Sequence, residues 1–137
     1  MDLDEARAVL AQQHRAVLAT RRAGGDVQMS PVLVVLDSAG RAVVSSRLTA
    51  YKVKNLQRDP WAALCVFPDD FFGRWVQVEG RATIVPPPQS IEGLVDYYRR
   101  ATGGDHPDWD DYRAAMVREQ RVLIQVELTR AGPDRSG

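Results

Sequence analysis

Basic side chains gather in one short part of the chain, between residues 40 and 58. This segment contains five cations and no carboxylate: Arg41, Arg47, Lys52, Lys54 and Arg58. The chain as a whole is balanced, with 18 Lys+Arg against 18 Asp+Glu. The local field of this segment is therefore positive, and an anionic group is the ligand that it would attract.

Both lysines of the chain, Lys52 and Lys54, lie in this segment, at the start of an expected short helix. They follow Ser45 and Ser46, which end an expected strand. A lysine binds phosphate as a mobile point charge, and hydroxyls and free helix N–H groups complete the coordination. The pattern predicts a phosphate cradle, although the same charges would also suit a solvated helix face.

The rest of the composition narrows the classes of partner. A formal net charge of zero over 137 residues gives no sign of a tail for nucleic acid. The longest apolar runs are far shorter than the roughly 18 residues of a membrane span, so we expect no integral membrane contact. The acidic N-terminus is unlike a secretory signal, and Cys65 is the single cysteine, so we expect a cytoplasmic protein.

Other kinds of site chemistry have little support. His14 and His106 lie far apart, and no Cys/His cluster has zinc spacing, so we expect no metal site. The sequence contains no nucleophile elbow, no Gly-rich dinucleotide motif and no P-loop. We assign no catalytic residue.

The hydrophobic pattern predicts a mainly β fold with small helices. We expect helices over residues 3–15, 50–58, 91–100 and 108–118, and strands over 16–20, 27–36, 41–46, 61–67, 74–85 and 122–128. The first three strands are separated by short turns, which predicts a three-strand meander. About six strands with short connections favour a six-stranded antiparallel barrel in one domain, residues 1–130, followed by a flexible tail, residues 131–137.

Three smaller predictions concern single positions. Ser90 resembles an N-cap of the third helix. Cys65, in an apolar strand, is expected in the core. Exposure of the two adjacent aromatic side chains of the Phe71-Phe72-Gly73 turn to water is unfavourable. We interpret this turn as either a dimer contact or a substrate lid.

The basic segment also resembles a known family. Residues 50–60, Ala-Tyr-Lys-Val-Lys-Asn-Leu-Gln-Arg-Asp-Pro, look like the cofactor-phosphate segment of the pyridoxamine 5′-phosphate oxidase-like split β-barrel proteins. Residues 16–20 and 28–32 resemble their opening hairpin, and residues 78–84 their central strand. Residues 106–123 resemble the actinobacterial branch that uses coenzyme F-420, the flavin/deazaflavin oxidoreductases of class B.

The resemblance implies a split-barrel homodimer with the cofactor at the subunit interface. Lys52 would hold the cofactor phosphate with Arg47, Ser45 and Ser46 would line the same pocket, and Lys54 and Asn55 would lie nearby. The strand segment Ser30, Pro31 and Val32 would run beside the cofactor ring, and Trp75 and Gln77 would form pocket walls given by the partner subunit. Ala50 departs from the arginine that many relatives carry two residues before the lysine, so phosphate binding would depend more on Lys52 and Arg47, or the cofactor tail would be held differently.

The function that the resemblance implies is a reductase. Reduced coenzyme F-420, a deazaflavin, would transfer a hydride to a small electron-poor acceptor such as an enone or quinone. One alternative is an FMN-dependent enzyme of the pyridoxamine 5′-phosphate oxidase type. Another is a non-catalytic protein that binds a deazaflavin or heme.

Overall fold

The computed structural model describes residues 1–134 of the chain. Its elements are α1 (Leu3–Leu10), β1 (Arg15–Arg21), β2 (Val27–Leu33), β3 (Val35–Leu36), β4 (Ala42–Arg47), α2 (Tyr51–Arg58), β5 (Trp61–Phe67), β6 (Val76–Val85), α3 (Ile91–Thr102), α4 (Trp109–Arg118) and β7 (Arg121–Asp134). None of these helices is long and apolar enough to cross a membrane.

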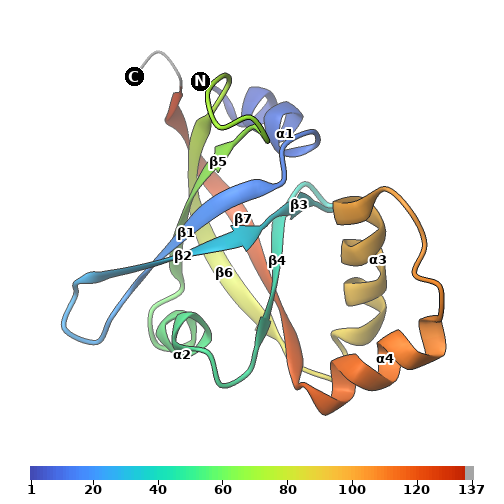
Figure 1. The fold of residues 1–137 in the computed structure, drawn as a ribbon. Helices are drawn as coiled ribbons and strands as arrows, with labels where there is room; N and C mark the ends of the chain where they lie inside the picture. The colour runs from blue at the N-terminus through green and yellow to red at the C-terminus, as the bar shows by residue number, and fades with distance from the viewer. Residues whose placement is uncertain (135–137) are drawn as a thin grey trace.

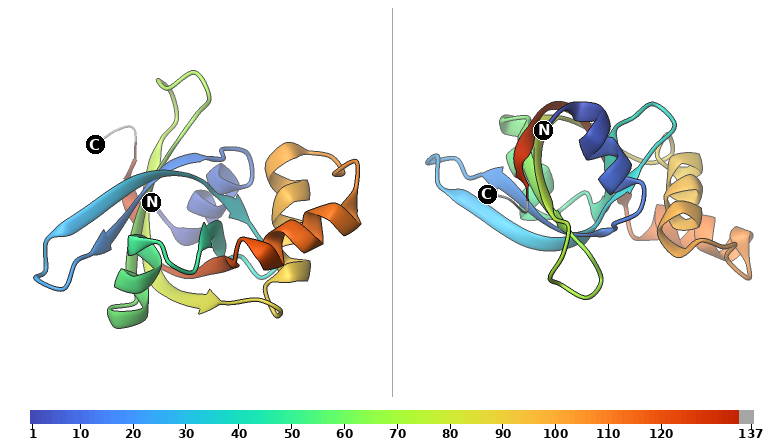
Figure 2. Two further views of the ribbon diagram at one scale, coloured as in Figure 1. Left: turned by 60° about the horizontal axis from the view of Figure 1, so that its bottom comes forward. Right: turned by 90° about the horizontal axis from the view of Figure 1, so that it is seen from above.

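The strands form one antiparallel sheet of seven, in the order β2-β1-β5-β6-β7-β4-β3. The sheet curls on itself, as the view from above shows (Figure 1, Figure 2). The predicted mainly β, antiparallel architecture is confirmed, and the predicted number of six strands is wrong. The chain leaves β2 at Leu33 and enters β3 at Val35, so the expected second strand is two strands at opposite edges of the sheet.

The break between β2 and β3 is at Val34, whose side chain is completely buried. Its N–H donates to the carbonyl of His14, 2.7 Å away, rather than to a neighbouring strand. β4 pairs with β3 and β7 and not with β2. The predicted meander is therefore wrong: the chain crosses from one edge of the curled sheet to the other.

The inner face of the sheet holds the main core. Along β1 the buried residues are Ala16, Leu18 and Thr20, which alternate with partly exposed ones as expected for a strand with one buried face. The same alternation in β6 buries Val76 and Val78. The helices α1 and α2 add apolar side chains to this cluster, so both cover the inside of the curl.

The outer face of the sheet is covered over one half only. There α3 packs on β3, β4 and β7, and a second cluster of Val35, Val43, Leu94 and Leu123 is buried beneath it. A side-chain carbon at Gly93 would lie 2.3 Å from Leu123 Cδ1, so glycine allows this close approach. Both α3 and α4 lie on one side of the barrel, away from the β1–β2 hairpin (Figure 1).

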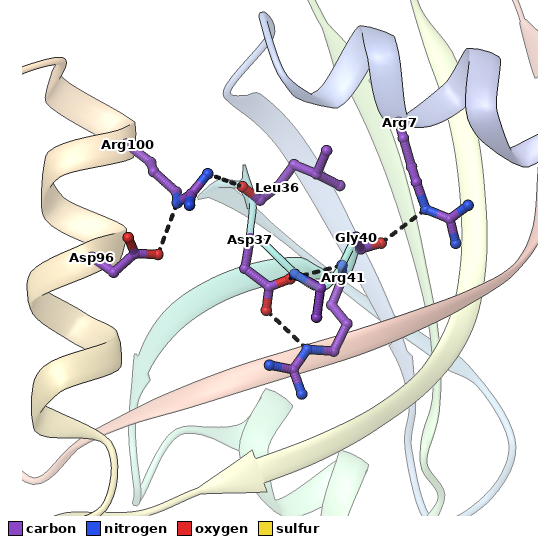
Figure 3. Close-up of polar contacts among 8 residues, drawn as sticks. Arg7, Leu36, Asp37, Gly40, Arg41, Asp96 and Arg100 are labelled. Carbon is purple, nitrogen blue, oxygen red and sulfur yellow. Dashed lines mark hydrogen bonds and ion pairs between the residues drawn. The ribbon is translucent and has the colours of Figure 1, made fainter.

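Arginines hold the turn between β3 and β4 in place (Figure 3). Arg7 of α1 donates to the carbonyl of Gly40 at 3.0 Å, and Arg41 forms an ion pair with Asp37 at 2.8 Å. Arg100 of α3 donates to the backbone at the end of β3 at 3.1 Å. Side chains of two helices, α1 and α3, and an ion pair within the turn thus fix the turn from which β4 starts.

Several predicted boundaries shift. α1 ends at Leu10 rather than at residue 15, because the chain turns there and then enters β1. β7 extends to Asp134, which pairs with Val76, so residues 131–134 are part of the sheet and not a flexible tail. Residues 135–137 of the predicted tail lie outside the described part. Ser90 is the N-cap residue of α3, as predicted, but its hydroxyl donates to the carbonyl of Arg121 at 2.9 Å and not to the helix.

Candidate functional site

Lys52 lies in the first turn of α2 with a half-buried side chain. Within residues 1–134 its amine makes no hydrogen bond and no ion pair. Burial, with the nearby charge of Arg121, lowers the pKa of Lys52 from its usual value. A partly buried ammonium group without a counter-ion is a ready place for an anion.

The start of α2 adds donors at the same place. Its N-cap residue, Ala50, offers no side-chain hydrogen bond to the helix. The first N–H groups of an α-helix have no partner within the helix and carry its positive dipole end. Together with the Lys52 amine they form the kind of cradle that binds phosphate.

Two arginines complete the positive charge around Lys52. Arg47 at the end of β4 and Arg121 at the start of β7 are directly opposite each other in the sheet. Both bind the carboxylate of Glu119, Arg47 at 3.3 Å and Arg121 at 3.2 Å. We did not predict Arg121 or Glu119 from the sequence, because only the pairing of β4 with β7 brings them beside the basic segment.

A tight connection places Glu119 and Arg121. α4 ends at Arg118, and Gln120 adopts a positive φ of 53°, which turns the chain into β7. The carbonyl of Gln120 accepts a hydrogen bond from Leu48 at 3.0 Å. This bond ties the end of β4 to the end of α4, so the two arginines and Glu119 stay together.

Tyr97 of α3 links the end of β2 to β4. Its hydroxyl donates to the carbonyl of Leu33 at 2.8 Å and also takes a hydrogen bond from the backbone of Ser45. Burial raises the pKa of this phenol, so it stays a donor over the ordinary pH range. Because β2 and β4 do not pair, this side chain brings the two strands together at the candidate site.

The predicted ring-binding segment, Ser30 to Val32, lies on an edge strand. In the described part of the chain β2 pairs with β1 alone, so its other edge has no partner strand there. Pro31, which lacks an N–H, is a residue typical of edge strands. The Ser30 hydroxyl is buried and lacks a hydrogen-bond partner within residues 1–134. An unsatisfied polar atom and an open strand edge fit a ligand with a polar rim.

Other predicted residues lie elsewhere. Ser45 faces α3, together with its sheet partner Leu123, whereas Ser46 is buried on the inner face with Val122. The prediction that both serines line the same pocket is therefore wrong, because adjacent strand residues point to opposite faces.

Asn55 and Lys54 have different surroundings from each other. The Asn55 amide is buried and donates to Thr20 Oγ1 at 3.2 Å, while its oxygen accepts from Arg58 at 3.0 Å. This side chain joins α2 to β1, and its hydrogen bonds are internal. Lys54 is exposed.

Trp75 and Gln77 lie on the uncovered outer face. Gln77 is opposite Cys65, which is opposite Val17 in the next strand. Trp75, just before β6, lines an apolar pocket of about 510 Å³ with side chains that include Phe71, Phe72 and Cys65. Cys65 is exposed, so the prediction of a core position is wrong: its strand has one face open. Within one chain these residues are separated from β2 by β1 and β5.

A curled antiparallel sheet of seven strands with small helices is the architecture of a split β-barrel protein. The family described as pyridoxamine 5′-phosphate oxidase matches residues 3–132. The chain belongs to this family.

Solved structures with the same fold include proteins that are described in different ways. A conserved hypothetical protein, Rv2991, from Mycobacterium tuberculosis is 22% identical with a TM-score of 0.78, covering 96% of this chain and 82% of that one. An F-420 reductase is 23% identical with a TM-score of 0.71, covering 92% and 94%. The heme storage protein HutZ from Vibrio cholerae is 14% identical with a TM-score of 0.71, covering 98% and 96%. At these identities the similarity establishes the fold alone.

Proposed function

We propose that the protein is an oxidoreductase that uses reduced coenzyme F-420. The observation that carries the proposal is the Lys52 amine at the uncapped start of α2, which has no hydrogen bond or ion pair within residues 1–134 and lies near Arg121. A phosphorylated cofactor supplies the missing anion. The bound deazaflavin would supply a hydride for an electron-poor organic acceptor such as an enone or quinone.

In this proposal the residues of the chain bind and orient. Lys52, Arg47 and the first N–H groups of α2 hold the phosphate. The free edge of β2 from Ser30 to Val32 offers backbone groups to the polar rim of the ring. No side chain is assigned to move a proton, and solvent can supply the proton that completes the reduction.

FMN is the second candidate cofactor, and the family match favours it, because the family is described as an oxidase of pyridoxamine 5′-phosphate. Heme is less well supported by the residues themselves. His14 Nδ1 lies 2.9 Å from the carbonyl of Val34, and His106 packs among aromatic rings between α3 and α4. Neither histidine lies beside the candidate site to ligate iron.

We also propose that two copies of the chain pair through the uncovered outer face of β2, β1, β5 and β6. Met29, Leu33, Phe71 and Phe72 expose 51–81% of their surfaces on this side. Apolar area of this extent is typical of a protein interface. Trp75 and Gln77, which lie away from the cradle of their own chain, would then wall the cofactor pocket of the partner.

Paired titrations test the proposal. We expect tight binding of coenzyme F-420, measured by the change in tryptophan fluorescence. We also expect an enone or quinone to oxidise the bound, reduced cofactor. Binding of FMN alone would instead favour the second candidate. Tight binding without turnover over a broad panel of acceptors would favour a carrier.

Substitution of the two lysines locates the phosphate. Lys52→Ala should weaken cofactor binding by about 1–3 kcal/mol, the scale of a charge-assisted hydrogen bond. Lys54→Ala, at the exposed neighbouring lysine, is the matched control and should have little effect. Because the chain has only these two lysines, amine labelling with peptide mapping gives a second readout: the cofactor should protect Lys52 and not Lys54. Equal effects of the two substitutions would place the phosphate elsewhere.

A further inference from the structure

Glu119 is the one carboxylate that binds the arginines of the candidate site within residues 1–134. Its Oε1 atom accepts from Arg47 at 3.3 Å and from Arg121 Nε at 3.2 Å. The charge of Arg121 also acts on Lys52, whose amine makes no hydrogen bond or ion pair with the described residues, 1–134. The backbone N–H of Ala50, the N-cap residue of α2, donates to the carbonyl of Arg47 at 3.0 Å. Two arginines with one carboxylate between them therefore lie next to the start of the helix that carries Lys52.

The position of Glu119 is fixed by the fold and not by its own flexibility. It is the C-cap residue of α4, and its backbone N–H donates to Ala115 at 2.8 Å. Its side chain is 30% exposed. A carboxylate held at a C-cap and bound by two arginines cannot turn away when a ligand arrives without breaking both ion pairs, so its negative charge stays near the ligand.

A fixed charge acts on a ligand in proportion to the charge of that ligand. A phosphate monoester carries about −1.5 to −2 at pH 7, whereas a phosphate diester carries a single negative charge. Glu119 opposes the monoester about twice as strongly as the diester. By lowering the positive potential of the site, it reduces the advantage that a doubly charged phosphate would otherwise have.

We propose that Glu119 is a specificity-determining residue of this site, which weakens the preference of the Lys52 cradle for phosphate monoesters and so favours a cofactor whose phosphate is a diester. The inference rests on the proposed function, since it needs a cofactor phosphate beside Lys52. It goes beyond that function by naming the chemical class of phosphate and the residue that selects it.

The test uses three ligands with one ring system and different charge: uncharged riboflavin, singly charged riboflavin 4′,5′-cyclic phosphate, and FMN. Dissociation constants are measured for the wild-type protein and Glu119→Gln at low ionic strength. Glu119→Gln should leave the dissociation constant of riboflavin unchanged. It should lower the dissociation constant of the cyclic phosphate about threefold and that of FMN about tenfold. The salt dependence of FMN binding should become steeper.

Two further variants serve as controls. Glu119→Asp keeps the charge and should stay near the wild-type pattern, which a purely structural role of the side chain would not predict. Glu127→Gln removes a carboxylate of β7 that lies six residues from Arg121, about 20 Å at about 3.3 Å for each residue, and should change none of the three constants.

The outcomes separate the inference from the function. If Lys52→Ala weakens FMN binding while Glu119→Gln changes all three ligands equally or none of them, the proposed site stands and the role of Glu119 is wrong. If the wild-type protein binds FMN no more tightly than riboflavin, the cradle does not hold the phosphate, and both proposals fail.

Discussion

The two halves of the outer sheet face differ sharply. Over β3, β4 and β7 the apolar side chains Val35, Val43 and Leu123 are buried by α3 and exposed by 4% or less. Over β2 and β5, Met29 and Cys65 occupy equivalent outward positions and are exposed. One half is completed by the chain itself, and the other half lacks a cover of its own. The difference separates residues that stabilise the fold from residues available for assembly.

The largest expected effect is in the covered half. Leu94 of α3 is completely buried against the sheet. Leu94→Ala should lower the free energy of unfolding by about 3 kcal/mol, since it leaves a cavity that the packed helix cannot fill. Urea denaturation followed by circular dichroism measures this loss. The matched variant in the open half, Met29→Ala, should change the free energy of unfolding by less than about 0.5 kcal/mol at a concentration where the protein is monomeric. Similar losses for both would remove the distinction between the halves.

The next effect concerns assembly. Met29→Asp places a charge on β2, the edge strand of the open half, and should weaken self-association by about tenfold or more, because the carboxylate would be buried in the interface without a partner. Sedimentation velocity over a range of concentrations measures this change. Val117, exposed on α4 beside the covered half, gives the control Val117→Asp, which should leave self-association unchanged. A stable dimer in Met29→Asp would mean that the copies meet through another surface.

The smallest effect is expected away from both halves of the outer face, at Lys52 of α2. Burial lowers the pKa of this lysine in the folded protein below its unfolded value of 10.5. Between those two pKa values the unfolded chain binds more protons, so the free energy of unfolding should rise as the pH rises through this interval. Lys52→Met should remove part of that rise, and Lys54→Met should keep it. Urea titrations from pH 8 to about 10.5 would check the difference, and a bound phosphate should diminish it by favouring the charged lysine.

The sequence was sufficient to predict which segments are helices and which are strands, and much of their order along the chain. Alternation over 76–85 and the apolar run over 61–67 predicted two strands that are present as β6 and β5. It did not predict the break at Val34, because an apolar run continues through that position and only the curl of the sheet separates its two parts. The length of β7 was also missed, since its last residues are too polar and too glycine-containing to resemble a strand without their partners in β6.

The candidate site was predictable where its residues are neighbours in the chain. Arg47 and Lys52 were recognised from one acid-free segment, and their joint binding of a phosphate stays a prediction. Arg121, Glu119 and Tyr97 belong to later elements, and their types gave no local signal. The serine pair shows a different limit: the spacing of Ser45 and Ser46 suggested a shared pocket, whereas the two-residue period of a strand sends them to opposite faces.

The pairing of β7 with β4 has a consequence for the order of folding. Arg47 and Arg121 face each other only after the final strand has docked between β6 and β4. Contacts between residues so distant in the chain form slowly, because much loop entropy must be lost first. A ribosome-bound chain that ends before β7 would lack Arg121, so binding of the proposed cofactor would require that β7 has been synthesised and has paired with β4.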